Sequence, residues 1–277
     1  MSYRRRILTA LASQQYIYME LKAGTTSLSF RAMLNGETNW STKTSGQDFD
    51  IISDDVNNPW CKWYIPRGRK LRRLQVTPTY TNSNLIGVRF STSFDFSGVV
   101  SWANCFEAGQ GTASIEYVDN IQFNPEATAF GYAFRYGSNT LKRITFKPGV
   151  VSTTANATTI NRMFHICSKD IFGGDLSWLS VKQGCDTTYW NTTGNFLPGT
   201  TNYKVITAIG DLYGSISFQY HPITLDSAIV VLNALKPVTT SETLTFHSTT
   251  WSRIQASPEA LALVAAKEAD GWTIVSA

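Results

Sequence analysis

The alternation of apolar and polar positions in the first third of the chain predicts a β-rich module. Residues 16–21 and 28–34 alternate as half-buried strands do, and the turn formers at 23–26 between them predict a hairpin. Residues 35–60 are rich in turn-forming Asn, Gly and Pro. Further short apolar runs predict strands at residues 61–65, 71–76 and 86–90. We therefore expect residues 1–92 to form an N-terminal β module.

Similar blocks recur from residue 94 onward. Phe106, Phe134 and Phe164 lie 28 and 30 residues apart, close to the period of roughly 20–29 residues of leucine-rich repeats. Each block offers one short strand, such as 144–146, and one short helical turn that carries the Phe. Stacked blocks would place Phe above Phe and strand beside strand, so we expect a short leucine-rich-repeat-like solenoid over residues 93–221. The alternative is a β-sandwich in which the aromatic spacing is incidental.

The last 56 residues, 222–277, carry clear helix boundaries. Thr224 or Asp226 can cap a helix over 225–235 whose apolar face holds Leu225, Ile229, Leu232 and Leu235. Ser257 followed by Pro258 begins a second helix, which reaches about Asp270 before Gly271. Strands are predicted at 244–246 and 272–275. This helix–strand–helix–strand unit would cover the open end of the solenoid, giving a mainly β (α+β) fold.

Composition supports a folded protein with an unusually uncharged surface. Charged residues make up 16% of the chain, against about 25% in an average domain. Polarity comes instead from neutral groups, including 33 Thr, and the aromatic fraction of 13% excludes a disordered chain. Such surfaces are common on extracellular and virion-exposed β proteins. The apolar run at 7–12 is shorter than the roughly 7–15 residues of a secretion signal, so we expect no export. No stretch approaches the roughly 18–20 apolar residues of a membrane span, so we expect no membrane insertion.

The net charge of +4 is concentrated in two basic clusters, one near the N-terminus and one within residues 67–73. We regard them as candidate assembly contacts, formed by Arg4, Arg5, Arg6, Arg67, Arg69 and Arg72. The alternative is a solvated edge that discourages strand pairing. Neither cluster is accompanied by a nucleic-acid-binding motif, so no nucleic acid partner is expected.

Aromatic residues in polar surroundings provide the candidate receptor contacts. Tyr189 and Trp190 lie in a Thr-, Asn- and Gly-rich stretch that indicates a loop, where rings can contact sugar or protein. Trp178 lies shortly before them, and we include it in the same candidate surface. The alternative is that these rings close the end of the apolar core.

Catalytic and metal-binding patterns are missing from the sequence. The three His are not paired at ligand spacing, the four Cys do not form a zinc pattern, and no phosphate-binding loop or nucleophile elbow occurs. We therefore expect no enzyme activity and no cofactor. One alternative is a carbohydrate-active enzyme that uses the acidic cluster of Asp48, Asp50, Asp54 and Asp55, although the sequence favours a solvated acidic turn as the explanation of that cluster.

The repeat blocks resemble a known family. Ala129–Phe146, Met163–Cys167 and Asp175–Trp178 are similar to BspA-like leucine-rich repeats, and the helix, strand, helix and Gly271-Trp272-Thr273-Ile274 ending is similar to the ends of such proteins encoded by gut Bacteroidales and their phages. The resemblance covers roughly residues 94–277. The repeats here are few, sparse in Leu and unevenly spaced.

The resemblance implies a non-enzymatic protein that presents a surface. For the phage-encoded form it implies a virion structural protein, tail-fibre-associated or decorating, that assembles in the host cytoplasm. Its expected partners are other virion proteins, further copies of the chain in a homo-oligomer, and a host surface glycan or protein. For the bacterial form it implies a secreted adhesin at the cell surface. The short apolar run at 7–12 favours the virion form.

Overall fold

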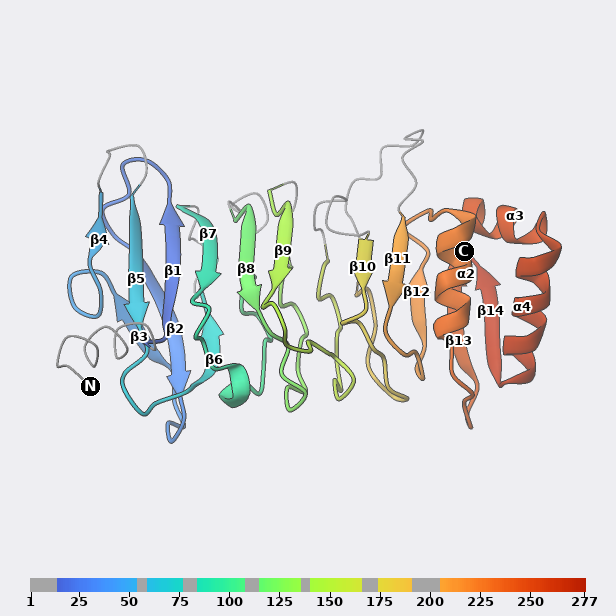
Figure 1. Ribbon diagram of the computed structural model, residues 1–277, viewed down its shortest axis with the longest axis horizontal. Coiled ribbons are helices and arrows are strands. Elements are labelled where there is room, and N and C mark those ends of the chain that lie inside the picture. Colours follow the sequence, from blue (N-terminus) through green and yellow to red (C-terminus); the bar gives the residue numbers. More distant parts are fainter. Residues whose placement is uncertain are drawn as a thin grey trace.

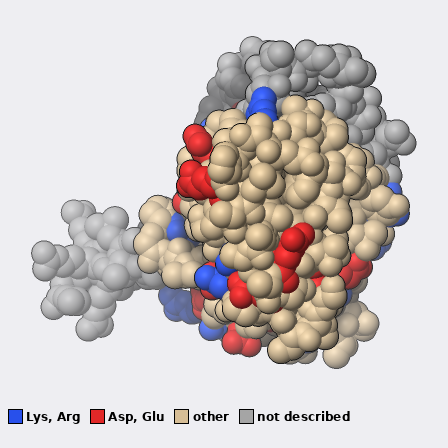
Figure 2. All heavy atoms as spheres, turned by 90° about the vertical axis from the view of Figure 1, so that its right-hand side faces the viewer, with Lys and Arg blue, Asp and Glu red and all other residues tan. Residues whose placement is uncertain are grey.

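The computed structural model describes residues 14–53, 59–76, 84–107, 115–135, 140–165, 174–190 and 205–277. Its strands follow one another along the long axis of an elongated molecule, from the N-terminal strands to a group of C-terminal helices (Figure 1). The fold is mainly β with several sheets, as predicted. At the C-terminal end uncharged side chains cover most of the visible surface, in keeping with the low charged fraction (Figure 2).

Two sheets form the N-terminal part. The larger sheet has the order β4-β5-β1-β7-β8-β9, and the smaller has the order β3-β2-β6. The large sheet is antiparallel as far as β7 and parallel from β7 to β9. Its strands are β1 (Tyr16–Leu21), β4 (Ile51–Ile52), β5 (Trp60–Tyr64), β7 (Leu85–Phe90), β8 (Tyr117–Ile121) and β9 (Arg143–Phe146). Those of the small sheet are β2 (Ser29–Leu34), β3 (Ser41–Thr44) and β6 (Leu71–Gln75).

The hairpin predicted over residues 16–34 is wrong, although both strands are present. β1 pairs with β5 and β7, whereas β2 pairs with β3 and β6 in the other sheet. The apolar sides of both strands are buried in one core, where Phe30 of β2 packs edge-on against Trp63 of β5. Alternation identifies the buried side of a strand but leaves its partner open, because either pairing buries the same side chains.

The phenylalanine stacking predicted for the repeats is confirmed. The rings of Phe106 and Phe134 are 5.2 Å apart and 12° from parallel, and those of Phe134 and Phe164 are 5.1 Å apart and 3° from parallel. The backbone around each ring is not a helical turn, however. Each of the three rings lies in a turn that contains a residue with φ near +60°, namely Asn104, Tyr132 and Arg162. The next turn has Tyr189 in the same conformation.

Backbone hydrogen bonds connect these turns in register. The N–H groups of residues 102, 104 and 106 donate to the carbonyl groups of 129, 131 and 133. Residues 130, 132 and 134 donate in the same way to 159, 161 and 163, and residues 160, 162 and 164 to 186, 188 and 190. Because each turn satisfies the polar backbone of its neighbour, the turns form a second ladder, separate from the large sheet.

The C-terminal unit contains the predicted elements and one more helix. The parallel sheet β12-β13-β14 packs through β14 against α3 and α4, while α2 packs on β11 and on those two helices; α3 was not predicted. Thr224 caps α2 by accepting a hydrogen bond from Ser227 N, and Ser257 caps α4. The remaining elements are η1 (Phe96–Gly98), β10 (Gly174–Leu176), β11 (Ile206–Ile209), β12 (Ile216–Phe218), α2 (Leu225–Ala234), β13 (Glu242–Phe246), α3 (Ser248–Gln255), α4 (Pro258–Ala269) and β14 (Trp272–Ser276).

The buried face of α2 includes the predicted residues, with Leu232 and Leu235 buried and Leu225 and Ile229 packed against the core, but it is wider than predicted. Its buried residues are Ser227, Ala228, Val231, Leu232 and Ala234, while Leu225 and Ile229 are half-buried. The face is wider than the Leu and Ile stripe because the helix is covered on one side by β11 and on another by α3 and α4.

Candidate functional site

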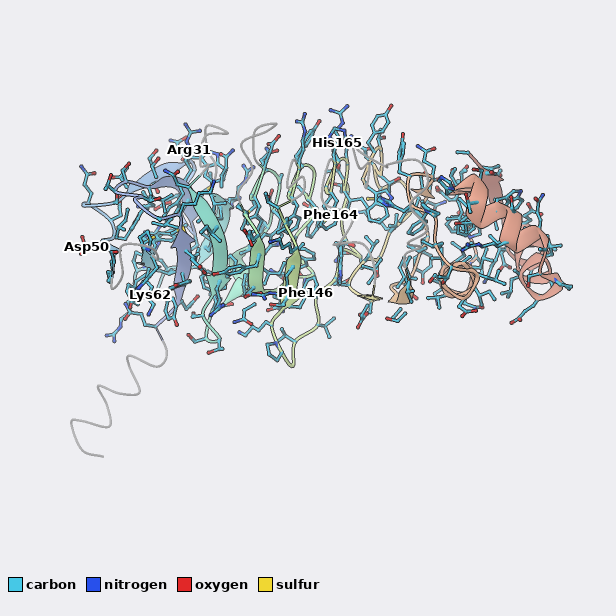
Figure 3. All side chains as sticks on the ribbon, turned by 90° about the horizontal axis from the view of Figure 1, so that it is seen from above. Arg31, Asp50, Lys62, Phe146, Phe164 and His165 are labelled. Carbon is cyan, nitrogen blue, oxygen red and sulfur yellow. The ribbon has the colours of Figure 1, made fainter. Side chains whose placement is uncertain are left out.

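The outward side of the large sheet gathers aromatic and charged side chains from five strands. Strand register sets them in two rows: Tyr18 lies between Lys62 and Arg89, and Glu20 lies between Trp60 and Gly87. The parallel strands extend both rows. We call the set the sheet-face array; it consists of Tyr16, Tyr18, Glu20, Trp60, Lys62, Tyr64, Arg89, Tyr117, Asp119 and Arg143. In Figure 3 its member Lys62 lies on the side of the molecule opposite Arg31 and His165.

Cations and rings alternate on the β5–β1 side of the array. The Tyr18 and Trp60 rings stack with centroids 5.7 Å apart, and Tyr16 meets Tyr64 edge-on at 5.6 Å. The Lys62 ammonium lies 5.0 Å from the Tyr16 ring and 5.1 Å from the Trp60 ring. Each such contact contributes about 0.5–1 kcal/mol at an exposed site, which holds the rings in place without burying them.

Asp119 organises the β7–β9 side. Its carboxylate accepts two hydrogen bonds from Arg143, Nε at 2.9 Å and Nη2 at 2.7 Å, and the Arg89 guanidinium lies 3.4 Å away. Burial alone would raise the pKa of Asp119. The hydrogen bonds from Arg143 and Thr145, with the charges of both arginines, outweigh burial and lower that pKa below its ordinary value. Asp119 therefore stays charged and fixes two exposed guanidinium groups on the surface.

Tyr117 bridges the two sides of the array. Its ring lies over Gly87, where an added Cβ would be 2.0 Å from the ring, and its hydroxyl donates to Glu20. Arg143 and Arg89 lie 5.0 and 5.8 Å from the ring. Burial, and next the hydrogen bond to Glu20, raise the pKa of Tyr117. The phenol is therefore protonated at neutral pH and acts as a donor, not as a nucleophile.

The array is suited to recognition. Tyr, Trp and Arg are the side chains most enriched where proteins contact partners, because they offer large rigid area together with hydrogen bonds. Arg89 and Arg143 keep about half of their side-chain surface exposed, at 51% and 53%, although both are anchored. A partner would meet donors, acceptors and rings that need little further ordering.

Two of the three predicted receptor contacts are wrong. Trp190 is 1% exposed and Trp178 is 9% exposed, so neither can contact a receptor at the surface. Trp190 occupies the position of Phe164 in the next turn, and its indole N–H donates to Ser217 O. Trp178 packs on Phe123 inside the core. Tyr189 is 48% exposed and remains a candidate contact.

The described members of the basic and acidic clusters are not part of the array. Arg67 and Arg72 are exposed, whereas Arg69 forms an ion pair with Glu37 at 3.0 Å. Asp48 accepts a hydrogen bond from Thr44 N and pairs with Lys43, as expected for an acidic turn. Arg4, Arg5, Arg6, Asp54 and Asp55 lie outside the described residues. Among the residues that the structure describes, no group of three or more His, Cys, Asp or Glu could hold a metal ion.

No protein-family model, curated protein or solved structure matches the chain. Within the described ranges, no helix is long and apolar enough to cross a membrane. The sequence did carry a signal for the sheet-face array: the outward-facing positions 16, 18 and 64 of the predicted strands are aromatic, and so is position 60 just before the third of these strands. Apolar alternation identifies only the buried positions of these strands, and without the strand order the aromatic positions cannot be joined into one surface.

Proposed function

We propose that this chain is a non-enzymatic phage virion structural protein, tail-fibre-associated or decorating, that presents an attachment surface to a host-cell glycan or protein. In this proposal residues 93–221 form a short leucine-rich-repeat-like solenoid, which serves as a rigid support. The observation that carries the proposal is the sheet-face array, an exposed and internally anchored set of rings and cations. Its family setting rests on the repeat and C-terminal motifs of the sequence.

The support has the regularity that a presenting surface needs. Successive turns hydrogen-bond in register, and the stacked phenylalanines between them are at most 3% exposed. Repeat units stacked in this way are each held in position by contacts with their neighbours. Three members of the sheet-face array, Tyr117, Asp119 and Arg143, lie on strands of this part of the chain. They are ordered before a partner arrives, which lowers the entropic cost of binding.

Mass spectrometry of purified phage particles tests the virion role. We expect the protein in particles at a fixed ratio to the major capsid protein, and that ratio would distinguish a head decoration from a tail component. Absence from particles, together with detection on bacterial cell surfaces, would overturn the virion role in favour of the secreted adhesin. Light scattering of the purified chain tests the expected homo-oligomer.

Binding of the purified protein to host cells tests the attachment surface. Arg89→Ala with Tyr18→Ala should reduce binding at least about tenfold, as removal of central interface residues commonly does. Arg31→Ala is the matched control, because Arg31 is an exposed arginine on β2, on the opposite side of the molecule (Figure 3). Equal binding by the double variant and the wild type would exclude the sheet-face array as the attachment surface.

A further inference from the structure

A column of alternating cations and rings runs along the stacked turns, away from the sheet-face array. The Arg135 guanidinium lies 4.9 Å from the Tyr132 ring. Arg162 of the next turn lies 5.7 Å from the same ring and 5.5 Å from the ring of Tyr189, one turn further on. His165, on the turn of Arg162, lies on the opposite side of the molecule from Lys62 (Figure 3). We call Arg135, Tyr132, Arg162 and Tyr189 the turn column.

The backbone beneath the column is strained at each of its repeat positions. Tyr132, Arg162 and Tyr189 have φ values of +61°, +51° and +52°. Gly or Asn adopts this left-handed conformation at lower energy, and the first turn has Asn104 there. The later turns carry two tyrosines and an arginine instead. Since the fold requires only the backbone conformation, we attribute the large side chains to what they do at the surface.

The charge of the column is only partly compensated. Arg135 pairs with Glu107 at 3.1 Å. Arg162 forms no ion pair with a carboxylate of the described residues. Its Nη1 donates a hydrogen bond to the Tyr132 hydroxyl at 3.4 Å, and its Nε is buried without a hydrogen-bond partner. Burial first, and then the charges of Arg135 and Arg162, lower the pKa of His165, so the surroundings of that ring are positive. One guanidinium between two tyrosines is therefore left for an external anion.

We propose that the turn column binds an acidic oligosaccharide, with a sugar carboxylate on Arg162 and an adjacent sugar ring against Tyr189. The inference rests on the attachment function proposed above and names a ligand class for a second surface. Arginine binds carboxylates through paired N–H groups, and an exposed aromatic ring offers a face to apolar C–H groups. A nucleic acid is less well matched, because its binding depends on several phosphates neutralised together and the column has one uncompensated arginine.

Calorimetric titration of the full chain with an oligogalacturonate tests the inference, with a neutral malto-oligosaccharide of the same length as the comparison. We expect the carboxylated probe to bind at least about tenfold more tightly, the factor that one charge-assisted contact provides. Arg162→Gln should remove that preference. Arg162→Lys should restore only part of it, because lysine keeps the charge and loses the planar paired donors.

Tyr189→Ala provides a second test that does not depend on the buried part of the column. The Tyr189 ring is 48% exposed, so its removal should leave the temperature of thermal unfolding nearly unchanged. The same substitution should lower the affinity for both probes several-fold. Arg31→Gln, at an exposed position on β2 outside both surfaces, is the matched control and should bind the oligogalacturonate within about twofold of the wild type.

Three results would overturn the inference: equal affinity for the two probes, unchanged oligogalacturonate affinity in both Arg162→Gln and Tyr189→Ala, or tighter binding of oligothymidylate than of the oligogalacturonate. If binding is lost in Arg89→Gln, on the sheet-face array, and kept in the column variants, the turn column is excluded while the proposed attachment function stands. Detection in particles is a separate measurement, so loss of the virion role would leave the binding result unaffected.

Discussion

At the scale of single residues, the missing side chain at position 87 shapes the sheet face. Gly87 faces outward on β7, directly opposite Tyr117 of β8, and the Tyr117 ring occupies the space where a Cβ would be. This position lets the phenol reach across β7 to Glu20 on β1. One glycine thereby allows an aromatic ring to connect strands that are not neighbours in the sheet.

We expect Gly87→Ala to lower the free energy of unfolding by about 1–3 kcal/mol, because the new methyl group must displace the Tyr117 ring. Urea unfolding measures the change. In a Tyr117→Ala background the same substitution should cost less than about 0.5 kcal/mol, since the clash is gone. Gly131→Ala is the control: its nearest neighbour would be Asn161 O at 3.5 Å, an ordinary contact. A similar loss in the control would contradict the explanation.

Asp119 should make stability depend on pH in the acid range. The pKa of Asp119 in the folded chain is below the ordinary 3.8. As the pH falls to 3.8 and below, the unfolded chain therefore takes up the proton first, and the free energy of unfolding decreases. Asp119→Asn should cost about 2 kcal/mol at pH 7, the size of its charge-assisted bonds, and the gap from wild type should shrink at pH 3. Glu268→Gln, at an exposed site on α4, is the control, and its free energy of unfolding should differ from that of the wild type by the same amount at each pH. Urea unfolding at each pH tests this, and a constant gap for Asp119→Asn would refute it.

At the scale of elements, the sequence predicted best the helices whose first residues include a recognisable cap. Thr224 and the Ser257-Pro258 pair predicted α2 and α4 because a cap acts within a few residues of itself. The helix α3 was missed: His247 caps it through Nδ1, at 3.1 Å from Thr249 N, and two threonines follow in the first turn. Neither feature is a usual helix start, so packing against α2, α4 and β14 decides the conformation.

The partners of the strands and the burial of Trp190 could not be predicted from the sequence, because both depend on residues far apart in the chain. The apolar alternation of residues 16–21 and 28–34 predicted both strands and could not place them in different sheets. Trp190 was taken for a loop residue because its neighbours in sequence are polar. Its burial follows from the turn ladder, which aligns residue 190 with residue 164 across a spacing shorter than the earlier ones. Backbone pairing of this kind depends on how all the turns stack, which the local sequence around residue 190 does not show.

Loss of the α4 cap should have a modest and specific effect. Ser257 accepts a hydrogen bond from Ala260 N, so Ser257→Ala should lower the free energy of unfolding by about 1 kcal/mol. Ser252→Ala is the matched control, because the exposed Ser252 hydroxyl donates to Ser248 O within α3 and alanine favours the helix. Urea unfolding should show no loss in the control. Equal losses would mean that the serines act through something other than capping.

At the scale of the whole molecule, one apolar core connects every part. Buried residues from Ile17 on β1 to Ile274 on β14 belong to a single cluster. Pairing of β7 with β8 crosses the predicted boundary at residue 92, and pairing of β12 with β13 crosses the one at residue 221. The three predicted domains remain a prediction, and their independence can be tested by unfolding.

We expect the chain to unfold by heat in one transition. Arrays of stacked units can unfold piecewise when the interfaces between units are weak. Here both junctions combine backbone pairing with ring contacts: Phe90 meets Trp102 at 6.2 Å, and Phe218 stacks on Phe246 at 6.4 Å. Separating a part would expose these rings, which disfavours intermediates.

Substitutions at the two ends make that expectation testable by calorimetry. Phe30→Ala at the N-terminal end and Trp272→Ala at the C-terminal end each remove a buried ring, and each should cost about 3–5 kcal/mol. If the molecule unfolds as one unit, either variant shifts the whole heat-absorption peak to lower temperature. If the predicted domains are independent, each variant shifts only the part of the heat-absorption peak that belongs to its own domain, and the rest of the peak stays at the wild-type temperature. Because the substituted residues lie in different sheets with no shared contact, the two outcomes cannot be confused.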